Sequence, residues 1–214
     1  MTKIITNLGE LDLKITSNMH LVIYFKELAG DFKAKIQIAA SKKLQLEHII
    51  LGGNVNCELS FTLEKDAELV LNSGFKLTNN NSLDYSYYAE HLGAESKSDF
   101  KLVGSLDGSA KKQSQLKIHF AKGAVGAISS EYEKISLFSD EAKNVAIPMI
   151  LSDESEAEGH HGFSSSHISE DALDYLQSRG IAFDKIKAEL TNNELLKIAR
   201  LTKQDDIIQD LYRH

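Results

Sequence analysis

Apolar residues recur at every second position in short segments through most of the first 150 residues of this chain. Successive side chains of a β-strand point to opposite faces, so this period gives each segment one apolar and one polar face. The clearest alternation occurs in residues 11–15, 59–63, 83–87 and 116–120. The pattern predicts strands, and we expect an all-β body.

Turn-forming residues separate these segments. The sequences are Gly52-Gly53-Asn54, Asn72-Ser73-Gly74, Asn79-Asn80-Asn81 and Asp107-Gly108-Ser109. Glycine adopts left-handed backbone conformations without strain, and asparagine or aspartate side chains bond to the local backbone. Each of the four sequences is therefore predicted to form a tight turn.

A weak repeat accompanies the strands, in which an apolar strand end is followed four residues later by alanine. It occurs as Leu63 to Ala67, Leu106 to Ala110, Phe120 to Ala124 and Phe138 to Ala142. Small residues at intervals suit the corners of stacked β-coils. The spacing is irregular, so the pattern leaves open both a coiled β structure and a twisted sandwich with ordinary hairpins.

The pattern changes after Pro148, the one proline of the chain. Residues 152–168 are polar, acidic and rich in histidine, which is typical of a linker. From Ser169 onward the apolar period is that of a helix, with Ser169 as its N-cap and Gly180 as its left-handed stop.

Three more helical segments are predicted beyond this stop. They are a short one over residues 184–190, one opened by a capping box at residues 191–194, and one over residues 205–211. The expected organisation is a β core over residues 1–151, a linker over 152–168 and a helical C-terminal subdomain over 169–214.

Composition and charge narrow the class of protein. The chain of 214 residues has 24 Lys and Arg against 31 Asp and Glu, a net charge of −7, which disfavours nucleic-acid binding. The longest apolar run is four residues, far below the roughly 20 that cross a membrane, and no secretory leader is recognised. One cysteine, Cys57, fits a reducing compartment, so we expect a cytoplasmic protein.

The second half of the chain contains an ordered series of residues that is more specific than composition or periodicity. It consists of Ile118-His119-Phe120-Ala121-Lys122-Gly123-Ala124, Glu131, Leu137-Phe138-Ser139, Ala142, Pro148, Gly159-His160-His161-Gly162, Ile168-Ser169-Glu170-Asp171-Ala172-Leu173 and Tyr175-Leu176-Gln177-Ser178-Arg179-Gly180-Ile181. This series resembles the last coils and first C-terminal helix of the SufB/SufD family of iron-sulfur cluster assembly proteins. The histidine before glycine, His161, is more similar to the SufD branch.

The resemblance implies a right-handed parallel β-helix with a helical C-terminal region that docks on SufC, an ABC-type ATPase. It also implies pairing through the β-helix with a SufB-like chain or a second copy, and a transient iron-sulfur cluster or iron as cargo. The sequence contains no Gly-x-x-x-x-Gly-Lys-Ser/Thr phosphate loop, so ATP hydrolysis is expected of a partner.

The resemblance also assigns candidate site residues. His161 corresponds to a family histidine at the subunit interface near the assembly site, and its imidazole can bind iron or accept a proton; the alternative is a surface histidine in a polar loop. Tyr175 and Arg179 are candidates for docking the ATPase, unless their helix only covers the β body.

Two further candidates come from residue chemistry alone. His160, His161 and Glu158 are a possible metal site, although a solvated acidic linker is the better explanation of this segment. Cys57 is a possible sulfur acceptor, which requires a thiolate, but its strand pattern favours a buried apolar role.

The leading hypothesis is a non-catalytic scaffold of iron-sulfur cluster assembly. A structural β-fold interaction module without cluster assembly is the alternative. An enzyme acting on polysaccharides is disfavoured, because the sequence offers no recognisable set of inward carboxylates on adjacent coils.

Overall fold

The computed structural model describes residues 2–167 and 170–213, which form thirteen strands and three helices in two parallel sheets and a C-terminal helical layer. We name the sheets odd and even after their strand numbers. The odd sheet contains β1 (Thr2–Ile5), β3 (Met19–Lys26), β5 (Lys43–Leu51), β7 (Glu68–Leu77), β9 (Lys97–Leu106), β11 (Ile128–Leu137) and β13 (Glu158–His167). The even sheet contains β2 (Gly9–Ile15), β4 (Ala29–Ile38), β6 (Asn54–Leu63), β8 (Ser82–His91), β10 (Lys111–Phe120) and β12 (Lys143–Ser152).

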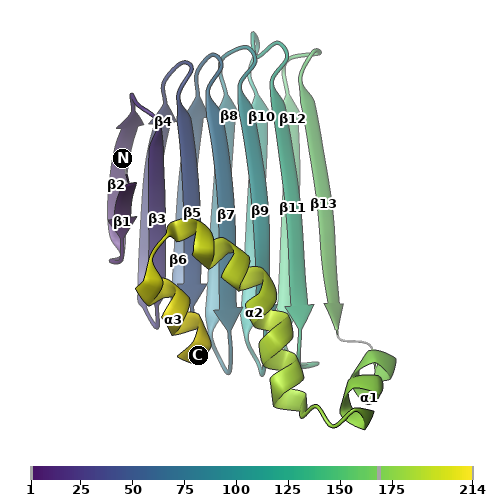
Figure 1. Cartoon of the computed structure of the whole chain (residues 1–214). Coiled ribbons are helices and arrows are strands. Elements are labelled where there is room, and N and C mark those ends of the chain that lie inside the picture. The colour runs from purple at the N-terminus through teal and green to yellow at the C-terminus, as the bar shows by residue number, and fades with distance from the viewer. Residues whose placement is uncertain (1, 168–169, 214) are drawn as a thin grey trace.

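Consecutive strands lie in opposite sheets, and neighbours within each sheet are parallel. In Figure 1 the strands of the nearer, odd sheet run downward while the chain advances from left to right. This winding is right-handed, as almost all parallel crossovers are. The body is therefore a right-handed parallel β-helix, which confirms the predicted fold class and excludes the sandwich of hairpins.

The repeated alanines lie at the corners of the coils. Ala67, Ala110 and Ala124 are completely buried, and the backbone N–H of each donates to the carbonyl three residues earlier. Ala142 makes the same bond to Ser139. The neighbouring coils enclose these corners. A side chain larger than the methyl group of alanine would therefore push the neighbouring coils apart.

The space between the two sheets, here called the lumen, holds the main apolar core. On β4, β6, β8 and β10 every second residue is buried in it, while the alternate residues are at least partly open to solvent. On β5 and β7 the residues of both faces are largely buried. This difference between the sheets arises because helices cover the odd sheet alone.

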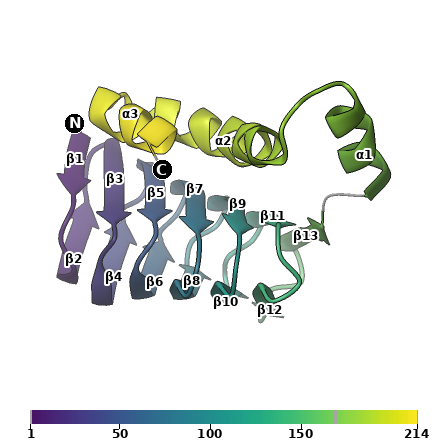
Figure 2. The ribbon, with the colours of Figure 1, turned by 90° about the horizontal axis from the view of Figure 1, so that it is seen from below.

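Three helices follow the β-helix: α1 (Glu170–Ser178), α2 (Phe183–Thr202) and α3 (Asp205–Arg213). Figure 2 shows α2 and α3 lying across the outer face of the odd sheet, with α1 beyond β13. A second apolar cluster joins them to the sheet and includes Val22, Ile49, Leu51, Val103, Leu195, Ile198 and Leu211. Asp210 of α3 also accepts hydrogen bonds from Tyr24 (2.7 Å) and Lys26 (2.8 Å) on β3.

The turn predicted at Asn72-Ser73-Gly74 is wrong, because these residues lie in the middle of β7. Gly74 faces α2, and a Cβ atom added to it would lie 2.8 Å from the Leu195 side chain. The glycine is therefore explained by the close approach of the helix to the sheet and not by a turn.

The helix boundary predicted at residues 191–194 is also wrong, since α2 continues without a break from Phe183 to Thr202. Thr191 is buried within it, and tertiary packing overrides its capping preference. Gly180 has the predicted left-handed φ of 79°, after the end of α1. The predicted cap at Ser169 lies outside the described residues.

The predicted linker over 152–168 contains a strand, β13, which pairs along its whole length with β11. Its side chains are nearly all exposed, so no burial imposed an apolar alternation on them. Backbone hydrogen bonds hold the strand, and these leave no trace in the hydrophobic pattern. None of the helices in the described parts of the chain is long and apolar enough to cross a membrane.

Candidate functional site

The C-terminal end of the β-helix is open, and β12 and β13 are its edge strands. Several large apolar residues are exposed there: Val145, Ile147, Ile150 and Leu151 of β12, and Phe163 of β13. Edge strands normally carry charged residues that prevent pairing with another chain. An apolar edge with free backbone groups is typical of an interface between chains.

The backbone of β12 shows which of its groups are free. Lys143, the first residue of β12, donates its N–H group to the carbonyl of Ala110, just before β10. Asp153, just after β12, donates to the carbonyl of Phe120, the last residue of β10. Because amide directions alternate along a strand, the nitrogen of Pro148 points to the open edge. Proline is tolerated in an edge strand in this orientation, where its missing donor breaks no bond within the sheet.

The two adjacent histidines of β13 lie on opposite faces. His161 pairs in register with Glu131, which shares the lumen face of β11 with the buried Glu133. His160 faces the exterior, 3.6 Å from Glu158. The predicted metal site of His160, His161 and Glu158 is therefore wrong as a single site, because strand alternation separates its members. Within the described residues, no group of three or more His, Cys, Asp or Glu side chains is placed to hold a metal ion.

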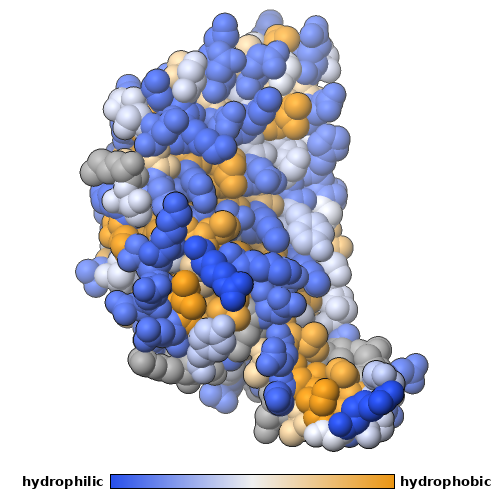
Figure 3. Space-filling view, in the orientation of Figure 1, coloured by the Kyte–Doolittle hydropathy of each residue, from blue (hydrophilic) through white to orange (hydrophobic). Residues whose placement is uncertain are grey.

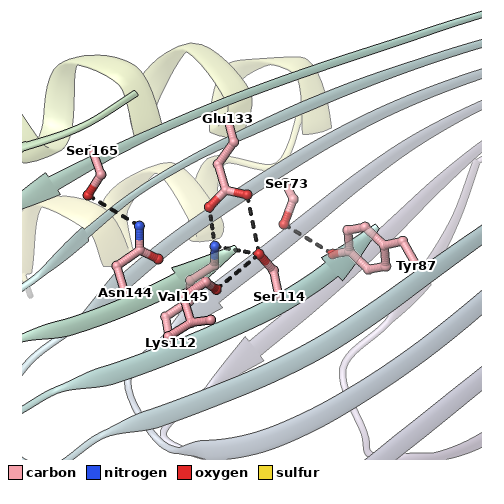
Figure 4. Close-up of polar contacts among 8 residues, drawn as sticks. All are labelled: Ser73, Tyr87, Lys112, Ser114, Glu133, Asn144, Val145 and Ser165. Carbon is pink, nitrogen blue, oxygen red and sulfur yellow. Dashed lines mark hydrogen bonds and ion pairs between the residues drawn. The ribbon is translucent and has the colours of Figure 1, made fainter. Parts of the chain in front are cut away.

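A polar cluster occupies the lumen next to this open end (Figure 4). The Lys112 ammonium group pairs with Glu133 and donates to Ser114 at 2.6 Å, and Ser114 donates to Glu133 at 3.3 Å. Lys112 also lies 5.1 Å from the ring centre of Tyr85, whose buried hydroxyl finds no hydrogen-bond partner among the described residues. Burial lowers the pKa of Lys112, an effect that the charge of Glu133 opposes.

Asn144 of β12 extends this polar lining to the edge of the even sheet. Its side-chain nitrogen donates to Ser165 Oγ at 3.3 Å, whereas its side-chain oxygen is buried without a partner in the part of the chain that the structure describes. An unsatisfied buried oxygen costs stability, so the end of the lumen is incompletely satisfied in the single chain.

Glu131 lies beside this cluster without an ion pair among the described residues. Burial raises its pKa to about 7; the charge of Glu133 adds to the rise and Lys112 opposes it. Since Lys112 is already paired with Glu133, Glu131 is the carboxylate that the cluster leaves uncompensated.

Sequence reasoning missed this cluster, although a signal was present. Lys112 and Ser114 stand in phase with Leu116 and Ile118, at positions where strand alternation predicts buried apolar side chains. Polar residues at lumen positions of two adjacent coils indicate a buried ion pair only once the register between the strands is known.

Cys57 lies in the lumen several coils away, and its predicted burial is confirmed. Its sulfur is 3.8 Å from His48 Nε2, and His48 Nδ1 is 2.6 Å from the Tyr87 hydroxyl, which donates to Ser73 Oγ at 3.2 Å. Burial raises the pKa of the thiol to about 12 and lowers the pKa of His48 to about 3. The pair is therefore neutral at pH 7 and lacks the thiolate that sulfur transfer requires.

Tyr175 and Arg179 lie together on α1. The Arg179 side chain donates to the Tyr175 hydroxyl at 3.4 Å and lies over its ring at 5.3 Å. Tyr175 is exposed, and Figure 3 shows an apolar patch over this part of the molecule. A groove of about 340 Å³ separates α1 from α2 and the odd sheet, and its lining includes Leu176, Leu190 and Leu195.

A model of a known protein family matches most of the chain. Residues 32–192, about three quarters of the chain, match the family model described as SUF system FeS cluster assembly, SufBD core domain. No curated protein gives a significant match. The matched region extends from β4 into α2 and includes the open end, the lumen cluster and α1.

Proposed function

The chain belongs to the SufBD family of iron-sulfur cluster assembly proteins, and from this premise we propose that it is a non-catalytic scaffold subunit of a cytoplasmic SUF complex. In this role it pairs through the open end of its β-helix with a SufB-like chain or a second copy. Its C-terminal helical region docks on a SufC-like ABC ATPase through α1. The nascent cluster or iron is cargo that the assembled complex holds transiently.

The observation that carries this proposal is the open end itself. Its edge strands combine free backbone groups with exposed Ile147, Leu151 and Phe163, and the family match covers all three. Pairing with another β-helix would satisfy the backbone groups and bury these side chains.

His161 supports a role for this end in cluster assembly. It is exposed on the lumen face of β13, so a partner chain that covers the end would enclose it. An imidazole there, next to Glu131, can donate to iron or take up a proton while the cluster forms. Cys57 is a weaker candidate as sulfur acceptor, since its thiol is buried and neutral.

The ATPase is proposed to dock on α1. Tyr175 and Arg179 form a joined aromatic and cationic pair on an exposed helix next to the apolar groove. Aromatic and arginine side chains frequently dominate the binding energy of interfaces.

The testing experiment is a pull-down of the full chain from its native cytosol, with ATPase activity measured on the recovered complex. Tyr175→Ala/Arg179→Ala is expected to lose the ABC ATPase. A matched control is Tyr212→Ala on α3, which removes an equally exposed tyrosine and should retain it. Recovery of the ATPase by both variants would reject docking at α1, and recovery of none by the wild type would reject the scaffold role.

The alternative is an interaction module that pairs through the same open end without assembling clusters. The apolar edge is equally compatible with such a module, because the edge indicates pairing with another chain and does not indicate whether a cluster is assembled. Reconstitution of the recovered complex with ferrous iron and sulfide separates the two: the scaffold yields cluster absorbance above the level of the isolated ATPase, and the module does not.

A further inference from the structure

The lumen face at the open end has an unbalanced charge. Lys112 is paired with Glu133, which leaves the carboxylate of Glu131. The residues of β12 and β13 that share this face include no lysine or arginine: they are Asn144, Ala146, Pro148, Ile150 and Ser152 on β12, and Gly159, His161, Phe163, Ser165 and His167 on β13. Each chain therefore presents one carboxylate, that of Glu131, to the molecule that covers the open end.

Glu131 is close to that covering surface. In the ladder it lies between Phe100 of β9 and His161 of β13, the edge strand, so a single strand separates it from a partner. The charged or titratable groups that face it are Glu133 on its own strand, Lys112 and Tyr85 across the lumen, and His161. Lys112 is the one permanent cation among them, and it is already paired with Glu133.

A second copy of the chain would not correct this imbalance. In a two-fold interface the same patch meets itself, so the middle of β13 approaches the middle of its counterpart. Two Glu131 carboxylates would then be brought together and withdrawn from water, and like charges in such positions suppress association.

We propose that Glu131 determines the choice of partner, so that the open end favours a related β-helical chain presenting a lysine or arginine and disfavours a second copy. This inference rests on the proposed pairing through the open end and specifies its partner by charge complementarity. Glu131 acts here as a specificity-determining residue.

The test varies the charge of residue 131 and keeps the rest of the chain unchanged. Sedimentation at pH 8 and low salt compares wild type alone, Glu131→Gln alone, Glu131→Lys alone, and wild type mixed with Glu131→Lys. The mixture and the Glu131→Gln variant are each expected to associate at least about tenfold more tightly than wild type with itself. Added salt should weaken association in the mixture more than association of Glu131→Gln, because salt screens the attraction between opposite charges.

Glu10→Gln on β2, at the opposite end of the β-helix, is the matched control and should associate like wild type. Glu131→Gln keeps the inference testable if Glu131→Lys fails to fold. Wild type that associates as tightly as Glu131→Gln overturns the role of the carboxylate but leaves the pairing intact. Absence of association in all four samples, the mixture included, overturns the pairing as well, and with it this part of the proposed function.

Discussion

The ammonium group of Lys112 on β10 and the carboxylate of Glu133 on β11 form an ion pair inside the lumen, where the two side chains are 0% and 2% exposed. They come from consecutive strands in opposite sheets, so the pair joins the two sheets near the open end. Ser114 bonds to both groups and completes the contact.

Removal of either partner is expected to destabilise the β-helix strongly. Lys112→Met or Glu133→Leu alone should lower the free energy of unfolding by about 3 to 5 kcal/mol, because each leaves a buried group without its partner. The double variant Lys112→Met/Glu133→Leu removes both charges and should recover much of this loss. Urea unfolding of the four proteins completes a double-mutant cycle, and single effects that simply add would contradict the coupling.

The pKa of Glu131 predicts how stability depends on pH. Its pKa is about 7 in the folded chain and near the ordinary 4.5 when unfolded, so the unfolded state loses its proton first. The stabilising contribution is complete below pH 4.5, falls as the pH rises to about 7, and is absent above it. Glu131→Gln should flatten this slope and stabilise the protein at pH 8 by roughly 2 kcal/mol, after a discount for partial exposure.

Urea unfolding of the monomer at pH 5, 6, 7 and 8 measures this dependence. His161→Gln is the control for the neighbouring imidazole and should retain the slope. A slope between pH 5 and 7 that is equal in wild type and Glu131→Gln would show that another group is responsible.

Cys57 is expected to be unreactive in the folded protein. Iodoacetamide at pH 8 should label it only as fast as the chain opens, since the thiol is buried and its pKa is raised to about 12. Intact-mass measurements over time, with a urea-unfolded sample as the reference, follow the labelling. Rapid labelling of the native chain would instead restore Cys57 as a candidate sulfur acceptor.

His161 and its neighbour His160 form a matched pair for testing the assembly site. His161→Ala should leave the free energy of unfolding within about 0.5 kcal/mol of wild type, because the side chain is exposed, yet reduce cluster formation in the reconstituted complex. His160→Ala, on the outer face of the same strand, should affect neither. Equal cluster yields from all three proteins would remove His161 from the site.

Several features of the fold were predictable because they depend on local patterning. The two-residue period located the strands β2, β6, β8 and β10, and the left-handed stop at Gly180 was correctly placed. The corner alanines indicated stacked coils. Burial of Cys57 follows from the same strand alternation, although nothing local indicated that its sulfur would lie 3.8 Å from His48 Nε2.

The remaining features depend on which segments meet. Gly74 resembles a turn residue until α2 is packed on it, and Thr191 resembles a helix cap until the surrounding helix is held against the sheet. β13 was not predictable from hydrophobicity, because an exposed edge strand is held by backbone bonds to its neighbour. The candidate site shows the same limit: His161 was identified from sequence, whereas Lys112, Glu131 and Glu133 were not.

Periodicity and turn chemistry in this sequence were thus sufficient for an all-β body and a helical C-terminus, since these arise from interactions between residues close along the chain. The family resemblance came separately, from an ordered series of residues between Ile118 and Ile181. The register of the coils required the folded structure. A register shift of one residue would turn His161 outward and separate Lys112 from Glu133, because side chains alternate between the two faces of a strand. The charge left at the open end is therefore a property of the stacked coils and not of any single segment.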